Sequence, residues 1–321
     1  MSKKCKGRRD DNSYKGGVQT MFQNREVKEN LLAVLLALLA AALYAISVPL
    51  SKLLLERMGS VFLSSFLYLG AGIGIGIMYL FTHKKEGAKS ERLTRKELPY
   101  TVGMIVLDIA APILLMIGLK TATAANVSLL NNFEIAATSL IALFIFKELI
   151  SKRVWFAIGL ITIASMLLSF EDMSSFRFST GSLFVLGACV CWGFENNCTR
   201  MLSSKNTYEI VILKGIFSGF GSFIIALIVR EAFPSAVVIL LSMLLGFVAY
   251  GLSIFFYVRA QNTLGAAKTS AYYAVAPFIG TLLSCLILRE KLGYMYFIAL
   301  AVMILGAGLI VWDTLKQTKE R

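Results

Sequence analysis

Ten long apolar segments divide this chain, and they limit its fold more than any other feature of the sequence. They lie at about residues 31–52, 60–82, 99–119, 124–146, 152–170, 181–203, 207–229, 236–258, 266–288 and 293–315. Because a helix needs roughly 20 mostly apolar residues to cross a bilayer, each segment predicts one transmembrane helix. The hydrophobic fraction of 57% exceeds the about 45–50% of soluble domains. We therefore predict an all-α integral membrane protein.

The ten segments form two sets of five with related polar positions. An offset of 148 residues aligns the polar side chains of the first segment with those of the sixth: Tyr44, Ser47 and Ser51 with Trp192, Glu195 and Thr199. Since five is odd, the second set would be inverted relative to the first, as in many secondary transporters. We predict inverted five-helix repeats at residues 31–170 and 181–315, a basic cytoplasmic arm at 1–30 and a cytoplasmic tail at 316–321.

Basic residues are distributed unevenly between the two sides that ten crossings define. With a cytoplasmic N-terminus, the inner segments hold 25 of the 32 Lys and Arg residues, including three at 200–214, and the outer segments hold seven. This bias predicts that both termini are cytoplasmic in a multi-pass protein of the cell (inner) membrane. It also accounts for the net charge of +13 without a nucleic-acid partner, because a basic arm orients the chain or contacts anionic lipid headgroups.

Residues that most enzymes use are scarce. The single histidine, His83, lies at a predicted helix end, and the five cysteines form no cluster with the spacing of metal ligands. The sequence has no phosphate-binding loop of the Gly-x-x-x-x-Gly-Lys-Ser/Thr type. Glycines such as those of Gly215-x-x-x-Gly219 fit close helix packing instead. We expect no enzyme activity, cofactor or metal site.

Three carboxylates lie inside predicted helices, namely Asp108, Glu134 and Glu195. A charge there costs about 2.5–3.5 kcal/mol on insertion scales, so such residues point to function. A low-dielectric environment also favours the protonated form of a carboxyl group, which suits these acids to bind a cation or carry a coupling proton. Each has polar or aromatic neighbours at helical spacing. The predicted substrate-binding or coupling residues are Glu134, Glu195, Asn131, Asn196, Trp192, Tyr44, Ser47, Asp108 and Tyr273.

Structural roles remain as alternatives for several of these residues. A protonated Glu134 bonded to Asn131 or Asn132 would join helices, and the aromatic side chains fit ordinary packing or an interfacial belt as well as a cation–π surface. The helix ends Lys147-Glu148 and Arg289-Glu290 are either solvated or form ion pairs that close opposite sides in turn. Three prolines inside the segments remove backbone donors and predict kinks: Pro49, Pro112 and Pro277.

Two related runs of sequence resemble a known family. One extends from Ala124-Ala125-Asn126 through Phe133-Glu134 to Phe146-Lys147-Glu148, and the other from Gly265-Ala266-Ala267 through Ala276-Pro277 to Leu288-Arg289-Glu290. They are similar to the EamA-type members of the drug/metabolite transporter superfamily, over roughly residues 31–315. The resemblance implies a ten-helix inverted-repeat carrier of small metabolites or drugs, often exported. It also implies that the Glu134 stripe and the Glu195-Asn196-Asn197 run lie in helices that line a central cavity.

These observations predict a secondary active transporter, an exporter of a small organic metabolite or drug across the plasma membrane by alternating access. A proton is a candidate coupling ion, and the protein would act as a monomer or homodimer in the lipid bilayer. Two other classes stay open, namely a non-transporting membrane scaffold or sensor that uses the basic arm, and a channel.

Overall fold

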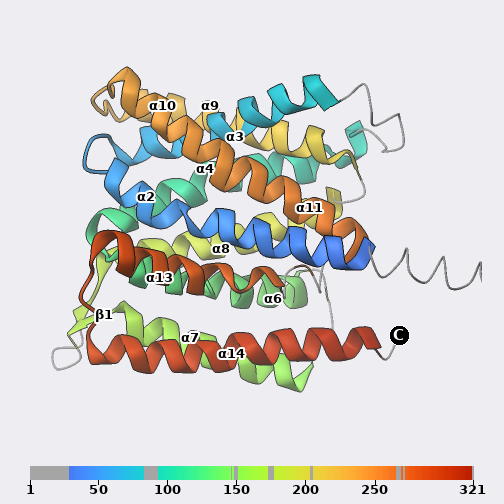
Figure 1. Ribbon diagram of the computed structural model, residues 1–321, viewed down its shortest axis with the longest axis vertical. Coiled ribbons are helices and arrows are strands. Elements are labelled where there is room, and N and C mark those ends of the chain that lie inside the picture. Colours follow the sequence, from blue (N-terminus) through green and yellow to red (C-terminus); the bar gives the residue numbers. More distant parts are fainter. Residues whose placement is uncertain are drawn as a thin grey trace, which may run out of the picture.

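The computed structural model describes residues 29–82, 93–145, 147, 151–172, 177–202, 205–264, 269 and 272–319. Its helices lie side by side as a bundle (Figure 1). The first described residues and the C-terminal part of α14 (Tyr294–Lys319) lie at the same end of this bundle, which we call the terminus end. The opposite end, which carries the connection at β1 (Phe170–Asp172), is called the far end.

The first half of the chain begins with a helical span, Glu29–Leu54, whose second part is α2 (Ser47–Leu54). It continues with these elements: α3 (Ser60–Thr82), η1 (Arg95–Glu97), α4 (Leu98–Thr121), α5 (Ala124–Leu130), α6 (Phe133–Phe144) and α7 (Lys152–Ser169). β1 then pairs antiparallel with β2 (Arg177–Phe178). The all-α prediction did not include this short ribbon, which joins the two halves.

The second half of the chain is also built of helices. Its elements before α14 are α8 (Thr180–Leu202), α9 (Thr207–Ile228), α10 (Ala236–Leu245), the π-helix η2 (Gly246–Leu252), α11 (Ser253–Leu264) and α13 (Ala276–Leu288). Within the described residues, six helical stretches are long and apolar enough to cross a membrane: Glu29–Leu54, Ser60–Phe81, Arg95–Thr121, Ala124–Phe144, Thr207–Ile228 and Ala236–Gln261. Two shorter apolar helices, Ala276–Leu288 and Tyr294–Leu309, accompany them.

Several predicted spans are interrupted inside the bundle. A turn at Ile46 lies three residues before Pro49, and a turn at 274–275 precedes Pro277, as expected where proline removes a backbone donor. Pro112, by contrast, lies within the continuous helix α4. The fourth span is also broken at Asn131-Asn132, which separates α5 from α6. Asparagine side chains compete for backbone hydrogen bonds, and this break was not predicted from the sequence.

Glycines allow two long helices to approach closely, as predicted. α3 packs most extensively on α9. A Cβ atom on Gly215 would lie 2.3 Å from the backbone nitrogen of Gly72, and one on Gly219 would lie 2.7 Å from that of Leu69. Because real Cβ atoms do not come so close to backbone, these positions need glycine for the observed packing.

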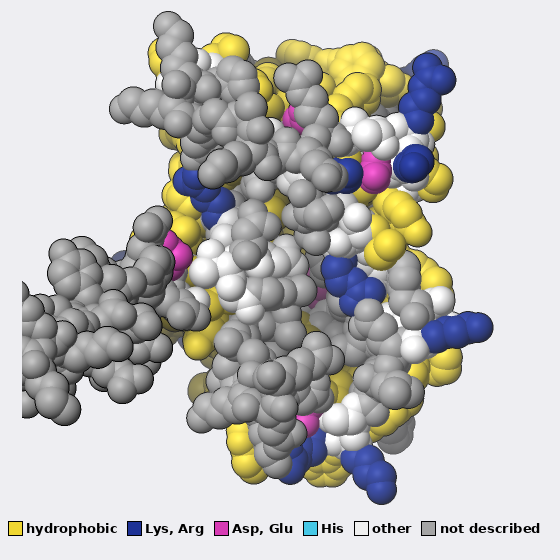
Figure 2. Space-filling model, turned by 90° about the vertical axis from the view of Figure 1, so that its right-hand side faces the viewer, with side chains coloured by type: hydrophobic (Ala, Val, Ile, Leu, Met, Phe, Trp, Pro, Cys, Tyr) yellow, Lys and Arg dark blue, Asp and Glu magenta, His cyan; other side chains and the backbone are white. Residues whose placement is uncertain are grey.

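Basic side chains are prominent at the terminus end, which Figure 2 shows face on. Arg95 and Lys96 precede α4 there, and Lys152 and Arg153 begin α7; all four are exposed. One predicted member of this group lies elsewhere. Lys214 was counted among the inner basic residues, but it is buried within α9, only 7% exposed. The number of Lys and Arg residues assigned to the inner segments therefore falls by one, and their excess over the outer segments remains. Lys214 can be buried because two buried carboxylates, those of Asp108 and Glu195, pair with its ammonium group.

Candidate functional site

A buried cluster of three charged side chains lies between α4, α8 and α9. The ammonium Nζ of Lys214 lies 3.1 Å from Oδ2 of Asp108 and 2.9 Å from Oε1 of Glu195. Asp108 is 0% and Glu195 2% exposed. Burying charge is costly unless opposite charges and hydrogen bonds compensate it, so one lysine between two acids explains how both carboxylates are tolerated. We call these three residues the ion triad.

Hydroxyl groups complete the ion triad. Tyr68 on α3 donates its hydroxyl hydrogen to Oδ1 of Asp108 at 2.9 Å, and Thr199 donates to Oε1 of Glu195 one helical turn away on α8. The Thr199–Glu195 contact connects two members of the stripe predicted on this helix. The third member, Trp192, is buried in the apolar core. With all groups ionised, the triad carries a net charge of −1.

Glu134 forms a second acidic centre on α6. Its Oε1 accepts a hydrogen bond from Nδ2 of Asn196 at 2.6 Å, and the same amide nitrogen lies 3.3 Å from Oγ1 of Thr138. Asn197 donates to the carbonyl oxygens of Thr138, at 3.2 Å, and Gly193, at 2.8 Å. The two asparagines therefore bind α8 to α6 through the polar stripe that was predicted around Glu134.

The partner of Glu134 differs from the structural alternative in the sequence analysis. The side-chain carboxylate of Glu134 is bonded to the side chain of Asn196 in the second half, whereas its contact with Asn131 is a backbone hydrogen bond. Sequence neighbours were the only partners considered there, because contacts between distant helices are not visible in a single sequence. Asn131 is buried in the break between α5 and α6, and its Oδ1 has no hydrogen-bond partner among the described residues.

Tyrosine rings lie beside these two acidic centres. The ring of Tyr44 lies 5.7 Å from that of Tyr250 and 5.9 Å from that of Tyr273, between ring centroids. Tyr273 also contacts Tyr257 at 5.0 Å, and Tyr250 contacts Tyr68 at 5.4 Å. We call these five residues the tyrosine cluster. It connects to the ion triad through Tyr68, and both Tyr44 and Tyr273 lie within electrostatic range of Glu134.

The predicted residues thus separate into connected and unconnected positions. Asp108 and Glu195 meet at Lys214, Glu134 meets Asn196, and Tyr44 meets Tyr273. Ser47 is fully buried as the first residue of α2, and Oδ1 of Asn131 has no hydrogen-bond partner within the described residues. Four contributors were missed: Lys214, Tyr68, Tyr250 and Tyr257. A signal for Lys214 was present, because it lies inside the predicted span at 207–229 with four apolar residues, 210–213, directly before it.

At the far end, acidic side chains hold the starts of helices. Glu290 accepts hydrogen bonds from the backbone nitrogens of Ala124, at 2.7 Å, and Ala125, at 2.8 Å, in the first turn of α5. Lys52 donates to the carbonyl oxygens of Leu119 and Ala122, at the end of α4. Opposite charges thus bind the two helix ends around the α4–α5 turn, as the helix dipole favours. Glu290 therefore has a capping role at this end, while its counterpart Glu148 lies outside the described residues.

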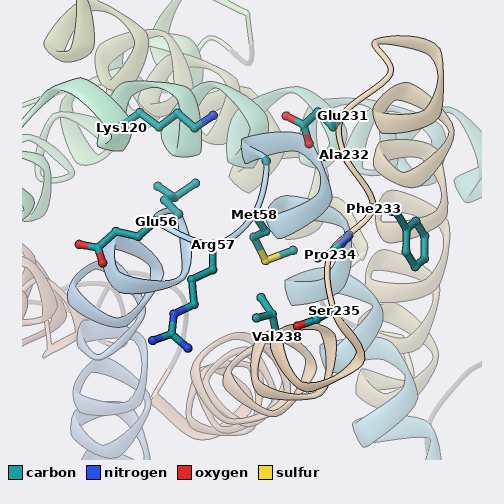
Figure 3. Close-up of a pocket in the computed structure, with 12 residues that line it drawn as sticks. Glu56, Arg57, Met58, Lys120, Glu231, Ala232, Phe233, Pro234, Ser235 and Val238 are labelled. Carbon is teal, nitrogen blue, oxygen red and sulfur yellow. The ribbon is translucent and has the colours of Figure 1, made fainter.

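A cavity of about 620 Å³ also opens at the far end, between the α2–α3 and α9–α10 connections (Figure 3). Glu231 is its prominent acid, but that carboxylate already accepts hydrogen bonds from the backbone nitrogens of Val61 and Phe62 at the start of α3. None of the predicted site residues lines this cavity. The buried network around Glu134 and the ion triad is therefore the stronger candidate for the functional site.

Apolar spanning helices around a buried polar network define a multi-pass membrane transporter, and the comparisons with known proteins agree. The EamA-like transporter family matches residues 31–170 and 179–312, and the chain belongs to this family. An uncharacterized transporter of Methanothermobacter thermautotrophicus is 26% identical over 294 residues, covering 85% of this chain and 84% of the relative. The uncharacterized transporter YyaM of Bacillus subtilis is 25% identical over 233 residues, covering 66% of this chain and 73% of the relative.

A solved crystal structure has the same fold. It aligns with a TM-score of 0.64 at 17% sequence identity, covering 86% of this chain and 94% of that chain. At this identity the likeness concerns the fold alone. The predicted family and the predicted transporter class are confirmed by the family match and the two relatives.

Proposed function

We propose that this protein is a secondary active exporter that moves a small organic solute across the plasma membrane by alternating access. One observation carries the proposal: the buried polar contacts join the two halves of the chain. Glu134 of the first half binds Asn196 of the second, and Asp108 of the first half binds Lys214 of the second. A site made by both halves changes its access when one half moves against the other.

The inverted-repeat arrangement supports this mechanism. Helices at equivalent places in the proposed repeats pack on one another: α3 on α9, α5 on α13 and α7 on α14. Lys147 and Arg289, 142 residues apart, both have a positive φ of 54° where their spans end. The family also matches the chain twice, over ranges close to the proposed repeats at 31–170 and 181–315. Ten crossings with both termini in the cytoplasm fit the basic terminus end.

The ion triad is suited to couple transport to protons. Protonation of Asp108 or Glu195 would remove one of the two charges that hold Lys214 and loosen the contact of α9 with α4 or α8. We therefore assign H⁺ coupling to the ion triad and solute binding to Glu134 with Asn196, Tyr44 and Tyr273.

Counterflow in proteoliposomes tests the carrier mechanism. Purified full-length protein is reconstituted, and vesicles preloaded with unlabelled amino acids, polyamines, quaternary amines or purines take up the corresponding radiolabelled compound. Saturable uptake that a preloaded solute accelerates supports alternating access. Flux that neither saturates nor responds to preloading supports a channel, and no flux for any compound supports the scaffold alternative.

Matched variants test whether counterflow depends on the charge of Glu134. Glu134→Gln keeps an oxygen that accepts from Asn196 but removes the charge, whereas Glu56→Gln changes an exposed acid at the far end. We expect counterflow to be lost in the first variant and retained in the second. Wild-type flux in Glu134→Gln contradicts the site assignment. A pH-sensitive dye inside the vesicles measures proton movement with the solute, and its absence contradicts the coupling assignment.

A further inference from the structure

We infer that the transported solute is an organic monocation with an aromatic or apolar body, held by Glu134 beside the tyrosine cluster. This inference rests on the proposed function and adds the chemical class of the solute. It depends on which of the three intramembrane acids has a cationic side chain as a partner, a difference that the sequence alone does not reveal.

Only one of the three acids lacks a cationic partner within the described side chains. Asp108 and Glu195 both pair with Lys214 and also accept hydrogen bonds from hydroxyl groups. Glu134 accepts from a neutral amide, that of Asn196. A buried carboxylate without a counter-ion is unfavourable, so it gains most from a ligand that brings one positive charge.

The surrounding charge disfavours other classes of solute. Glu134 lies within electrostatic range of both Glu195 and Lys214. The lysine is already bound to two carboxylates, so it cannot offer an uncompensated positive charge to an anion. With all four groups ionised, the site carries a net charge of −2. An anionic solute would be repelled, and the carboxylate of a zwitterion would lack a cationic partner.

The tyrosine cluster indicates the body of the cation. Tyr44 and Tyr273 lie within electrostatic range of Glu134, and their rings pack against each other beside it. Aromatic faces attract cations and also pack against apolar groups. An organic cation with a ring or alkyl body satisfies the acid and these rings together, whereas a small inorganic cation satisfies only the acid.

Buried polar atoms without a partner in the described part of the chain lie next to Glu134 in sequence, at Asn131 and Asn132. The side chain of Asn131 is 5% exposed, and its Oδ1 has no hydrogen-bond partner among the described residues. It lies three residues before Glu134, in the break between α5 and α6. Buried polar atoms are normally satisfied. An ammonium group has hydrogens to donate to both this amide oxygen and the carboxylate.

Binding of five small probes to the full-length protein in detergent tests the inference. Benzylamine, which is cationic at neutral pH, is compared with benzyl alcohol (neutral), benzoate (anionic), phenylalanine (zwitterionic) and methylamine (cationic without a ring). Each is titrated while the thermal unfolding midpoint is recorded, because only a ligand that prefers the folded state raises it. We expect benzylamine to give the largest shift and benzoate to give none.

Variants separate the charge from the rings. Glu134→Gln is expected to weaken benzylamine binding by at least about 10-fold, while Glu56→Gln leaves it within about twofold. Tyr44→Phe keeps the ring and should bind almost as wild type, whereas Tyr44→Leu should lose about fivefold. Equal shifts for benzyl alcohol and benzylamine, or unchanged affinity in Glu134→Gln, would overturn the inference.

The two proposals can fail separately. Counterflow of phenylalanine or a purine with no benzylamine binding leaves the carrier in place and refutes the monocation. Benzylamine binding that depends on Glu134, without counterflow of any labelled solute, supports the cation site and refutes transport. Counterflow of radiolabelled benzylamine that is lost in Glu134→Gln supports both.

Discussion

Replacing Lys214 by methionine should strongly destabilise the protein, because it removes the only cation of the ion triad. Lys214 contacts Asp108 at 3.1 Å and Glu195 at 2.9 Å, and all three side chains are buried. Methionine has a similar length and fills the same space without charge. The variant therefore tests the electrostatic contribution with little change in packing volume.

The expected magnitude follows from the burial of the acids. Removing one partner of a buried ion pair costs about 3–5 kcal/mol, because the remaining charge is left uncompensated. Here two carboxylates lose the same partner, so we expect the upper part of that range at pH 8. Asp108→Asn leaves the Glu195–Lys214 pair intact and should cost much less.

Unfolding by sodium dodecyl sulfate in mixed micelles, followed by circular dichroism, measures these free energies. Lys291→Met is the matched control, because Lys291 is exposed at the far end. A loss in Lys214→Met no greater than in this control would refute the electrostatic reasoning. Restored stability when Lys214→Met is combined with Asp108→Asn and Glu195→Gln would support it.

Two further predictions concern packing and helix capping. Gly215→Ala should lower the unfolding free energy by about 1–3 kcal/mol, because its Cβ would meet the backbone of Gly72. Gly159→Ala is the control: a Cβ there would have nothing within 4 Å, so the same sodium dodecyl sulfate titration should show no loss. Glu290→Ala should lower the unfolding free energy by about 0.5–2 kcal/mol, because it frees the first backbone amides of α5. In this variant a cysteine placed at the buried Ser128 should react faster with an impermeant thiol reagent, as measured by mass spectrometry. An unchanged labelling rate contradicts the capping role, and Glu56→Ala is the control.

The sequence was sufficient for the features that depend on local pattern. Spans such as 60–82 and 207–229 agree closely with α3 and α9, because the bilayer imposes length and hydropathy on each segment. Turns near Pro49 and Pro277 follow from the missing backbone donors. The face that carries Glu134 and Thr138 was also predicted, since helical spacing decides which side chains share a side.

The contacts between helices could not be predicted in the same way. Lys214 pairs with residues from two other helices, and nothing in its own segment names those partners. Its position in the first third of the predicted span at 207–229 led to its being counted as an inner-side charge. Tyr250 was not among the predicted site residues, yet its ring contacts those of Tyr44 and Tyr68. Tertiary packing, not periodicity, assigns these residues to the site.

The arrangement of the polar residues also indicates which part of the bundle moves. The ion triad binds α4, α8 and α9 together, whereas Glu134 lies on α6, beyond the break that separates α6 from α5. The other end of α5 is held by Glu290 at the far end. We therefore expect a solute at Glu134 to move the short helix α5 about the Asn131-Asn132 break and loosen the Glu290 contacts while the triad persists. If so, benzylamine should accelerate thiol labelling at Ser128→Cys in the wild-type background and have no further effect in Glu290→Ala. Equal acceleration in both would place the movement elsewhere.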